Sequence, residues 1–189
     1  MRSSVTIWPG GRRALIAAVV FGGLSLMLAP APALAQSEDT LKSQFILNFA
    51  RFTTWPAAAF ASSSAPLVVG FVAAPELADV FEKLATGKNV NGRELKVKKF
   101  GSASLLDDSC QVVVAAPGPQ GKAVAAKIKG KHVLVVGQDA GFLDAGGIIN
   151  LIVDGGGRIT FEINLAPAHA ASLELDQKLK ALAKSVRGA

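Results

Sequence analysis

Three short apolar runs constrain the fold of this chain more than any other feature. They occupy residues 67–73, 111–116 and 132–137. Each is too short for a typical helix and shows no polar alternation, a pattern typical of strands buried on both faces of a parallel sheet. Parallel strands need long crossover connections, usually helices, so we expect helices between these runs.

Helical spacing appears before the first apolar run. The stripe on this expected helix consists of Leu41, Phe45, Phe49 and Phe52. We expect Asp39 or Thr40 to cap its start. The helix must end near Thr54, because the dipeptide Trp55-Pro56 keeps Trp55 out of the α-helical region.

Two more helices follow from the same reasoning. The first begins at Pro75, a position where the missing N–H costs nothing. Its apolar face consists of Leu77, Val80, Phe81 and Leu84. The turn Asn91-Gly92 then leads into a more exposed strand from residue 95. The second helix covers about residues 120–129, between the second and third apolar runs.

The last third of the chain predicts a β-hairpin followed by a helix. Two strands, 148–153 and 158–163, flank a glycine-rich turn. Apolar and polar residues alternate in the second strand, so Phe161 is expected to face the core and Glu162 the solvent. A closing helix is expected from Asp176 onward. Its apolar face consists of Leu179, Leu182, Ala183 and Val186.

Together these elements predict an α/β protein. Strands that alternate with helices and end in a hairpin are typical of a layered sheet with a mixed edge. We therefore expect a single three-layer α/β/α domain with a mixed sheet and a C-terminal β-hairpin plus helix. Its expected bounds are residues 36–189, a length that suits one hydrophobic core.

The N-terminus has the order of a secretory signal. Basic residues come first, an apolar run (14–28) follows, and Ala33-Leu34-Ala35 resembles the small-residue site that signal peptidase cuts. The run is shorter than the roughly 20 residues that span a bilayer as a helix, and an uncleaved membrane anchor is the alternative. We expect cleavage between Ala35 and Gln36, loss of residues 1–35 as a secretory signal peptide, and localisation in the periplasm.

Composition argues against nucleic acid as a partner. The chain has a net charge of +6, but three of its arginines lie in the expected signal. Lysines cluster around residues 96–99 and 122–131, yet the chain contains no tyrosine, and no aromatic residue interleaves with the second cluster to stack on bases. We therefore interpret both clusters as solvated faces and expect no nucleic acid partner.

The chain has one cysteine, Cys110, so it can form no internal disulfide. Cys110 directly precedes the second apolar run, which predicts a buried or half-buried free thiol. An intermolecular disulfide is the alternative.

Catalytic and cofactor motifs do not appear in the sequence. The two histidines, His132 and His169, belong to no metal-spaced pair and to no Cys/His cluster. The chain has no G-x-S-x-G nucleophile turn. Residues 118–122 resemble a phosphate loop but lack its glycine spacing and its Ser or Thr, and the glycines 155–157 precede a strand rather than a helix. We expect no catalytic, cofactor-binding or metal-binding residues, and no enzyme activity.

Several polar residues lie among the apolar segments. They are Asn48, Arg51, Asn150, Arg158, Glu162 and Asn164. Buried polar groups need partners, and one interpretation is local hydrogen bonding, for instance Asn164 capping a following helix. The other interpretation is a recognition surface, and both stay open at the level of the sequence.

Four motifs and the single cysteine resemble the YfiR family. LKSQFILNFARFTTWP (41–56) is similar to the opening helix of that family, and NVNGREL (89–95) is similar to its turn. Cys110 stands before a valine-rich strand at the matching place. GFLDAGGIINL (141–151) and RITFEIN (158–164) are similar to the most distinctive segment of the family. The motifs occur in the same order over nearly the whole mature chain.

The resemblance implies a periplasmic regulator that is not an enzyme. Members of the family bind the periplasmic sensor domain of an inner-membrane diguanylate cyclase and hold it inactive, which lowers cyclic di-GMP and biofilm formation. A three-layer α/β fold and a homodimer are also implied. Members often carry a second cysteine in the first strand that can bridge to the one at Cys110, but residues 67–71 here contain none. Redox control through an internal disulfide is therefore not expected.

Partner contacts are expected at aromatic and charged residues, where interfaces concentrate binding energy. We expect that some of the following residues share one exposed surface: Arg51, Phe52, Trp55, Arg158 and Glu162. The alternative is that Phe52 and Trp55 belong to the core and that both arginines only solubilise the protein. A periplasmic small-ligand-binding domain coupled to another membrane receptor is the alternative function.

Overall fold

The computed structural model describes residues 37–188, which are built around one mixed sheet. Its strands are β2 (Leu67–Val72), β3 (Asn89–Val90), β4 (Arg93–Phe100), β5 (Val112–Ala115), β6 (Leu134–Gly137), β7 (Ile149–Val153), β8 (Ile159–Asn164) and β10 (Ser185–Arg187). Their order across the sheet is β10-β8-β7-β6-β5-β2-β4-β3. A separate antiparallel pair consists of β1 (Thr53–Thr54) and β9 (Glu174–Leu175). No helix among these residues is long and apolar enough to cross a membrane.

The predicted signal peptide, residues 1–35, lies outside the described residues, as does Gln36 on the far side of the expected cleavage site.

The three apolar runs form the parallel centre of the sheet, as predicted. β2 pairs in parallel with β4 and β5, β5 with β6, and β6 with β7. All residues of β2, β5 and β6 are buried, as expected for continuous apolar strands. β7 and β8 then form the antiparallel hairpin, and β10 joins β8 in parallel at one edge. The mixed α/β sheet is confirmed.

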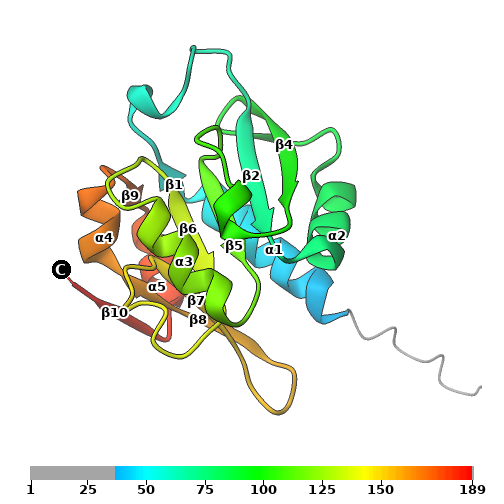
Figure 1. Ribbon diagram of the computed structural model, residues 1–189, viewed down its shortest axis with the longest axis vertical. Helices are drawn as coiled ribbons and strands as arrows, with labels where there is room; N and C mark the ends of the chain where they lie inside the picture. The colour runs from blue at the N-terminus through cyan, green and yellow to red at the C-terminus, as the bar shows by residue number, and fades with distance from the viewer. Residues whose placement is uncertain (1–36, 189) are drawn as a thin grey trace, which may run out of the picture. The chain divides into compact units, whose positions relative to one another are not determined.

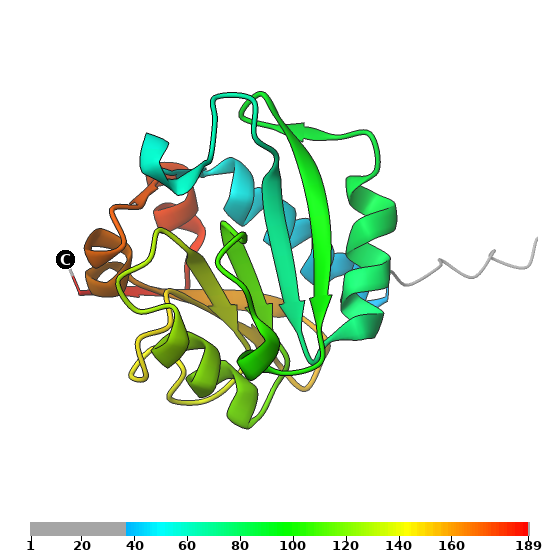
Figure 2. The ribbon, with the colours of Figure 1, turned by 45° about the horizontal axis from the view of Figure 1, so that its top comes forward.

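Helices cover both faces of the central strands. They are α1 (Glu38–Arg51), α2 (Pro75–Ala85), α3 (Pro119–Lys127), α4 (Leu165–Ala170) and α5 (Gln177–Leu182), with the 3-10 turns η1 (Ala57–Ala59) and η2 (Ala103–Leu105). Figures 1 and 2 show α1 and α2 on one face of the sheet and α3 on the other. This is the layered arrangement that alternating strands and helices predict.

The sheet separates two hydrophobic clusters. The larger cluster lies toward α1 and α2, where the ring centroids of Phe49 and Phe161 are 5.0 Å apart in an edge-on arrangement. Phe161 is 2% exposed, which confirms the predicted register of the hairpin. The smaller cluster lies toward α3 and contains Phe142 and Cys110.

The first helix begins and ends earlier than predicted. Ser37 is the N-cap, and its hydroxyl accepts from Thr40 N at 3.3 Å, so neither Asp39 nor Thr40 is the cap. The helix ends at Arg51 instead of continuing to residue 54. The physical reason is tertiary, because residues 53–54 turn into β1 and pair with β9.

The closing helix is shorter than predicted. α5 ends at Leu182, and the chain then turns into β10. Lys184 N donates to Phe161 O at 2.8 Å, because the chain here pairs with the open edge of β8 instead of continuing the helix. Of the predicted apolar face Leu179 is buried, but Leu182 is 72% and Val186 41% exposed.

Candidate functional site

The face of the β7–β8 hairpin that points away from α1 is only partly covered. Parallel strands bring crossover helices that cover a sheet, but β7 returns directly to β8 without one. Asn150 and Glu162 stand opposite each other in this hairpin, on the face opposite to their neighbours Leu151 and Phe161. Leu151 and Phe161 fill the larger core, so the other face is free to carry polar side chains.

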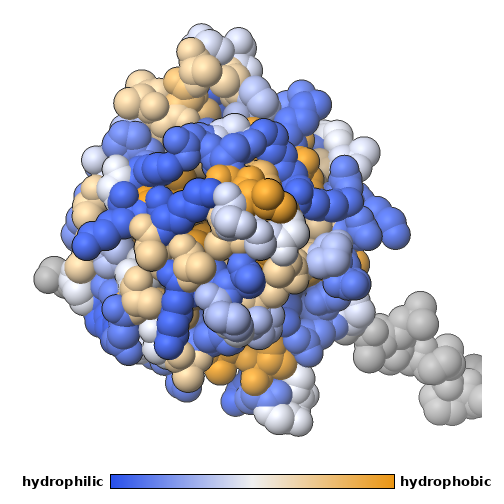
Figure 3. Space-filling view, viewed as in Figure 1, coloured by the Kyte–Doolittle hydropathy of each residue, from blue (hydrophilic) through white to orange (hydrophobic). Residues whose placement is uncertain are grey.

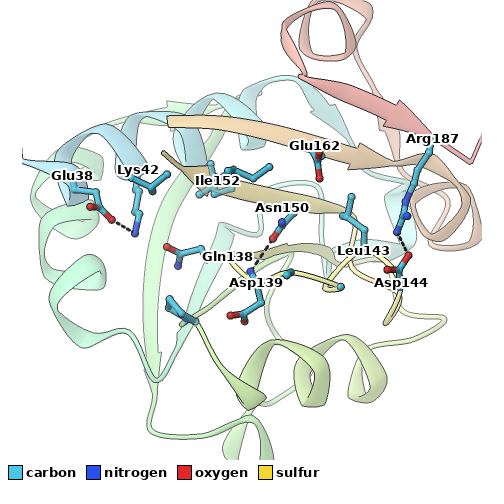
Figure 4. A pocket seen from close by; sticks show the side chains of 15 residues that line it. Glu38, Lys42, Gln138, Asp139, Leu143, Asp144, Asn150, Ile152, Glu162 and Arg187 are labelled. Atoms are coloured by element: carbon cyan, nitrogen blue, oxygen red, sulfur yellow. Dashed lines mark hydrogen bonds and ion pairs between the residues drawn. The ribbon is translucent and has the colours of Figure 1, made fainter. Parts of the chain in front are cut away.

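A pocket of about 520 Å³ lies beside this face, at the carboxyl ends of β5, β6 and β7. Open α/β sheets bind their ligands at such a place, outside the carboxyl ends of the parallel strands. We call it the polar pocket, because many of its lining side chains are charged or amides. These side chains are Glu38, Lys42, Gln138, Asp139, Asp144, Asn150, Glu162 and Arg187 (Figure 4).

Asn150 organises one wall of the polar pocket. It is only 7% exposed, and its Oδ1 accepts the backbone N–H of Asp139 at 3.0 Å. Both carboxylate oxygens of Asp139 in turn accept the N–H of Gly118 at 2.8 Å, at the start of α3. Gln138 Nε2 donates to Ala115 O at 3.2 Å. These bonds hold the loop after β6 against β5 and β7, so the pocket has a rigid frame.

The charged groups of the polar pocket fall into two classes. Lys42 Nζ pairs with Glu38 at 2.6 Å, and Arg187 pairs with Asp144 at 2.6 Å. The Glu162 side chain has neither an ion pair nor a hydrogen bond to another residue in the range 37–188, and Glu162 lines the pocket from β8 (Figure 4). One acidic side chain of the pocket therefore lacks a partner within the described part of the chain.

The structure places the five candidate partner residues at four places, and two of them, Arg51 and Phe52, line one depression. Glu162 lies in the polar pocket, and Arg158 is exposed at the tip of the hairpin. Arg51 and Phe52 line a separate depression of about 310 Å³. That depression lies at the C-terminal end of α1, whereas the polar pocket lies at its N-terminal end, and 14 helical residues span about 20 Å.

Trp55, the fifth predicted residue, belongs to the core. It is 9% exposed, and its indole Nε1 donates to Gln111 O at 3.2 Å. The Gln111 side chain accepts from Val68 N at 2.9 Å and donates to Ala59 O at 2.8 Å. Of the two alternatives stated for Trp55, burial holds, because the indole closes the amino end of the central strands.

Arg158 is held by Asp154 at the hairpin tip. Asp154 Oδ1 accepts the backbone N–H of Arg158 and of Gly156, each at 3.0 Å, and Oδ2 accepts from Arg158 Nε at 3.0 Å. These bonds, led by the Arg158 backbone N–H, lower the pKa of Asp154. The tip thus presents a fixed pair of opposite charges at the end of the hairpin.

Cys110 is a buried free thiol, as predicted, and it is 2% exposed. Burial raises the pKa of its thiol to about 11. A Cβ added to Gly70 would lie 2.7 Å from the Cys110 sulfur, so this glycine in β2 makes room for the thiol. Because the thiolate is the reactive form, Cys110 is inert at neutral pH.

The remaining candidates for chemistry take structural places. His132 Nδ1 lies 2.8 Å from Ala171 O, and His169 is exposed on α4. The Gly118 amide, in the stretch that resembles a phosphate loop, already binds the Asp139 carboxylate. Within residues 37–188, no group of three or more His, Cys, Asp or Glu side chains is placed to hold a metal ion. Asn164 caps α4, one of the two roles considered for it.

A second hollow, of about 380 Å³, adjoins the polar pocket at Asp144. Its lining is mostly apolar and comes from α3, β6, α4 and the segments that connect them, and it includes Lys129 and Lys131. Lys131 pairs with Asp108, and Lys127 donates to Ser104 O at 2.7 Å. Figure 3 shows that hydrophilic side chains cover much of the face above α3, which fits the interpretation of these lysines as a solvated face.

Several residues of the polar pocket were not candidates in the sequence. Glu38 and Lys42 have the spacing of an ordinary helical ion pair, which gives no sign of a pocket. Gln138 and Asp139 could have been found, because they directly follow the buried strand 132–137, where a carboxyl-end site is expected.

Comparison with known proteins gives one family match. Residues 39–184 match the family model described as YfiR/HmsC-like. No curated protein matches the chain.

Two solved structures are distantly similar. A conserved domain protein from Vibrio cholerae O1 biovar El Tor is 14% identical, with a TM-score of 0.45, over 63% of this chain and 54% of that one. The ABC domain in complex with L-Trp from Streptococcus pneumoniae is 10% identical, with a TM-score of 0.45, over 69% of this chain and 57% of that one. The match thus spans little more than half the length of either structure.

Proposed function

This chain belongs to the YfiR/HmsC-like family, and on that premise we propose that it is a periplasmic regulator of cyclic di-GMP signalling. It binds the periplasmic sensor domain of an inner-membrane diguanylate cyclase and holds the cyclase inactive, which lowers cyclic di-GMP and biofilm formation. The family is regulatory and not catalytic, so the protein acts by contact.

The observation that carries this proposal is the family match, which covers residues 39–184 and so nearly all of the described chain. The polar pocket supports it. Charged and amide side chains stand there on a frame held by hydrogen bonds, and one of them, Glu162, has no partner within residues 37–188. Polar groups that a fold leaves uncommitted on a rigid frame are suited to binding another molecule.

A role in the periplasm requires export. The basic, apolar and small-residue order of residues 1–35 supports a cleaved signal peptide. The intact mass of the protein from a periplasmic extract should match a chain that starts at Gln36. Full-length protein in the membrane fraction would contradict this part of the proposal. We expect a homodimer in solution, which sedimentation equilibrium would test.

Deletion of the gene tests the regulatory function directly. Deletion should raise cyclic di-GMP, and the wild-type gene should restore the low level. The charge reversals Arg51→Glu and Arg158→Glu test the two exposed contact candidates, and either should leave the melting temperature nearly unchanged because exposed charges contribute little to stability. If deletion leaves cyclic di-GMP unchanged, the regulatory proposal is wrong. If deletion acts and both reversals are silent, the contact lies elsewhere on the molecule.

The polar pocket also supports a second candidate function, a small-ligand-binding domain that reports to another membrane receptor. Its volume of about 520 Å³ lies within the range of small-molecule sites. An adjacent gene for a membrane-anchored cyclase favours the first function, whereas an adjacent sensor kinase or outer-membrane receptor favours the second.

A further inference from the structure

The charges around the polar pocket do not balance. Its two basic side chains, Lys42 and Arg187, are each paired with an acidic one. Two further carboxylates remain, and neither forms an ion pair within residues 37–188. The Asp139 carboxylate accepts only the Gly118 N–H, and the Glu162 carboxylate has no hydrogen bond among these residues. Basic residues outnumber acidic ones in the chain as a whole, so this negative excess is a local property of the pocket.

Asn150 gives a second and independent sign of a bound group. Only 7% of the Asn150 surface is exposed, and its Oδ1 already accepts the Asp139 N–H. Its Nδ2 has no acceptor among residues 37–188, and Figure 4 shows the amide at the pocket wall between Gln138 and Glu162. Nδ2 borders the pocket rather than being sealed in the core, so a group bound there can accept from it, whereas a simple cation cannot.

The unpaired Glu162 carboxylate and the unpaired Asn150 N–H lie on adjacent strands. Asn150 of β7 and Glu162 of β8 are directly opposite in the antiparallel register, so their Cβ atoms are about 4.5–5.5 Å apart. A ligand that satisfies both must carry a cation and, a short distance away, a hydrogen-bond acceptor. A basic residue within a peptide has this chemistry, because its side chain ends in the cation and its main chain supplies a carbonyl.

We propose that the polar pocket binds a lysine or arginine residue presented by a protein partner. The ammonium or guanidinium group meets the carboxylate of Glu162, with Asp139 adding negative potential, and a main-chain carbonyl of the same segment accepts from Asn150 Nδ2. This inference rests on the proposed function, in which the protein works by contact, and it names the contact. The pocket of about 520 Å³ holds one long side chain with part of its main chain.

Capped single residues are the probes that test this site. N-acetyl-arginine amide and N-acetyl-lysine amide carry both the cation and the carbonyl. N-acetyl-glutamine amide lacks the charge, and butylguanidine keeps one guanidinium charge but lacks the carbonyl. Isothermal titration calorimetry on the mature wild-type protein should show binding of the two capped basic residues, with the glutamine analogue and butylguanidine at least tenfold weaker.

Matched glutamine substitutions locate the binding. Glu162→Gln removes the charge in the pocket and should weaken the capped basic residues at least tenfold. Glu174→Gln is the control, because Glu174 is exposed beside the separate depression that contains Arg51. It should leave the affinity unchanged. Circular dichroism and the melting temperature establish that both variants are folded.

Each other outcome overturns the inference. If no capped basic residue binds, or if Glu174→Gln weakens binding as much as Glu162→Gln, the pocket is not the site. If butylguanidine binds as tightly as the capped arginine, the site takes a free cation and not a residue of a partner. The titration needs no cyclase, so a gene deletion that leaves cyclic di-GMP unchanged would disprove the proposed function while the binding result stands.

Discussion

The amino and carboxyl ends of the central parallel strands differ in whether their polar groups have partners. At the amino end, Trp55 covers the strands, and its indole N–H, the Gln111 side chain and the Val68 N–H all have partners. At the carboxyl end, the polar pocket stays open, and Glu162 and one group of Asn150 have no partner within residues 37–188. The named polar groups at the amino end of the strands are therefore paired, whereas the carboxyl end keeps polar groups without a partner in this range.

The amino end is also where a long loop is fixed. Arg93 stacks over the Phe60 ring at 3.6 Å from its centroid and donates to Ala65 O at 2.6 Å and Ser62 O at 3.2 Å. A loop of small residues has little apolar surface of its own, so these contacts order it. The amino end therefore contributes to stability, and we propose that recognition takes place at the opposite end of the sheet. Each of the following changes tests that division.

The largest effect is expected for Trp55→Ala. The substitution removes a buried aromatic side chain and one of the two donors to Gln111 O, which keeps the Leu134 N–H, so the free energy of unfolding should fall by about 3–5 kcal/mol. Urea titration followed by circular dichroism measures it. A loss below about 1 kcal/mol would mean that the indole does not seal the amino end.

The next effect is expected for Gln111→Ala. Its side chain bonds Val68 N and Ala59 O at once, and removal leaves a buried N–H unpaired, at a cost of about 1–3 kcal/mol. Hydrogen exchange of the Val68 amide should accelerate in the same variant. Unchanged exchange at Val68 would contradict the role given to this side chain.

The architecture of the sheet could be predicted from the sequence because its signal is local. Every residue of β2, β5 and β6 is buried, and the continuous apolar composition of these strands distinguishes them from half-exposed strands. The helix ends could not be predicted in the same way. Phe52 O accepts from Asp176 N at 2.8 Å, across a long stretch of sequence, and such a contact leaves no local pattern.

The candidate site could be predicted only in part, for the same reason. Glu162 and Asn150 stood out as polar residues in apolar strands, and the hairpin register brings them together. Lys42 lies in a helical stretch where a lysine is usually exposed, and its burial depends on packing that the sequence does not display. Trp55 was ambiguous because an aromatic residue suits both a core and an interface.

A smaller effect on the free energy of unfolding is expected from ionisation of Cys110, which lies beside the amino end of the central strands. Its pKa is raised from 9.0 to about 11, so the folded state keeps the thiol proton at a pH where the unfolded chain releases it. The stability from this group is complete below pH 9.0 and decreases as pH rises toward about 11. At about pH 9.5 the loss should be under about 1 kcal/mol.

The control for that measurement is Cys110→Ala, compared with the wild type at neutral pH and again in the alkaline range. The wild type should lose more stability than the variant on going to alkaline pH. Equal losses would show that the thiol is not shielded at this end of the sheet. A reductant should leave the melting temperature of the wild type unchanged, because one cysteine forms no internal disulfide.

The smallest effect on stability is expected at the open end, for Glu162→Gln. The half-buried side chain of Glu162 has no ion pair or hydrogen bond among residues 37–188, so removal of its charge breaks no such contact. The free energy of unfolding should change by less than about 0.5 kcal/mol, and the loss of charge beside Asp139 and Asp144 can make that change slightly favourable. Urea titration at neutral pH measures this change, with Gln111→Ala measured in parallel. A cost as large as that of Gln111→Ala would mean that Glu162 supports the fold, and the division between a sealed and an open end would then be wrong.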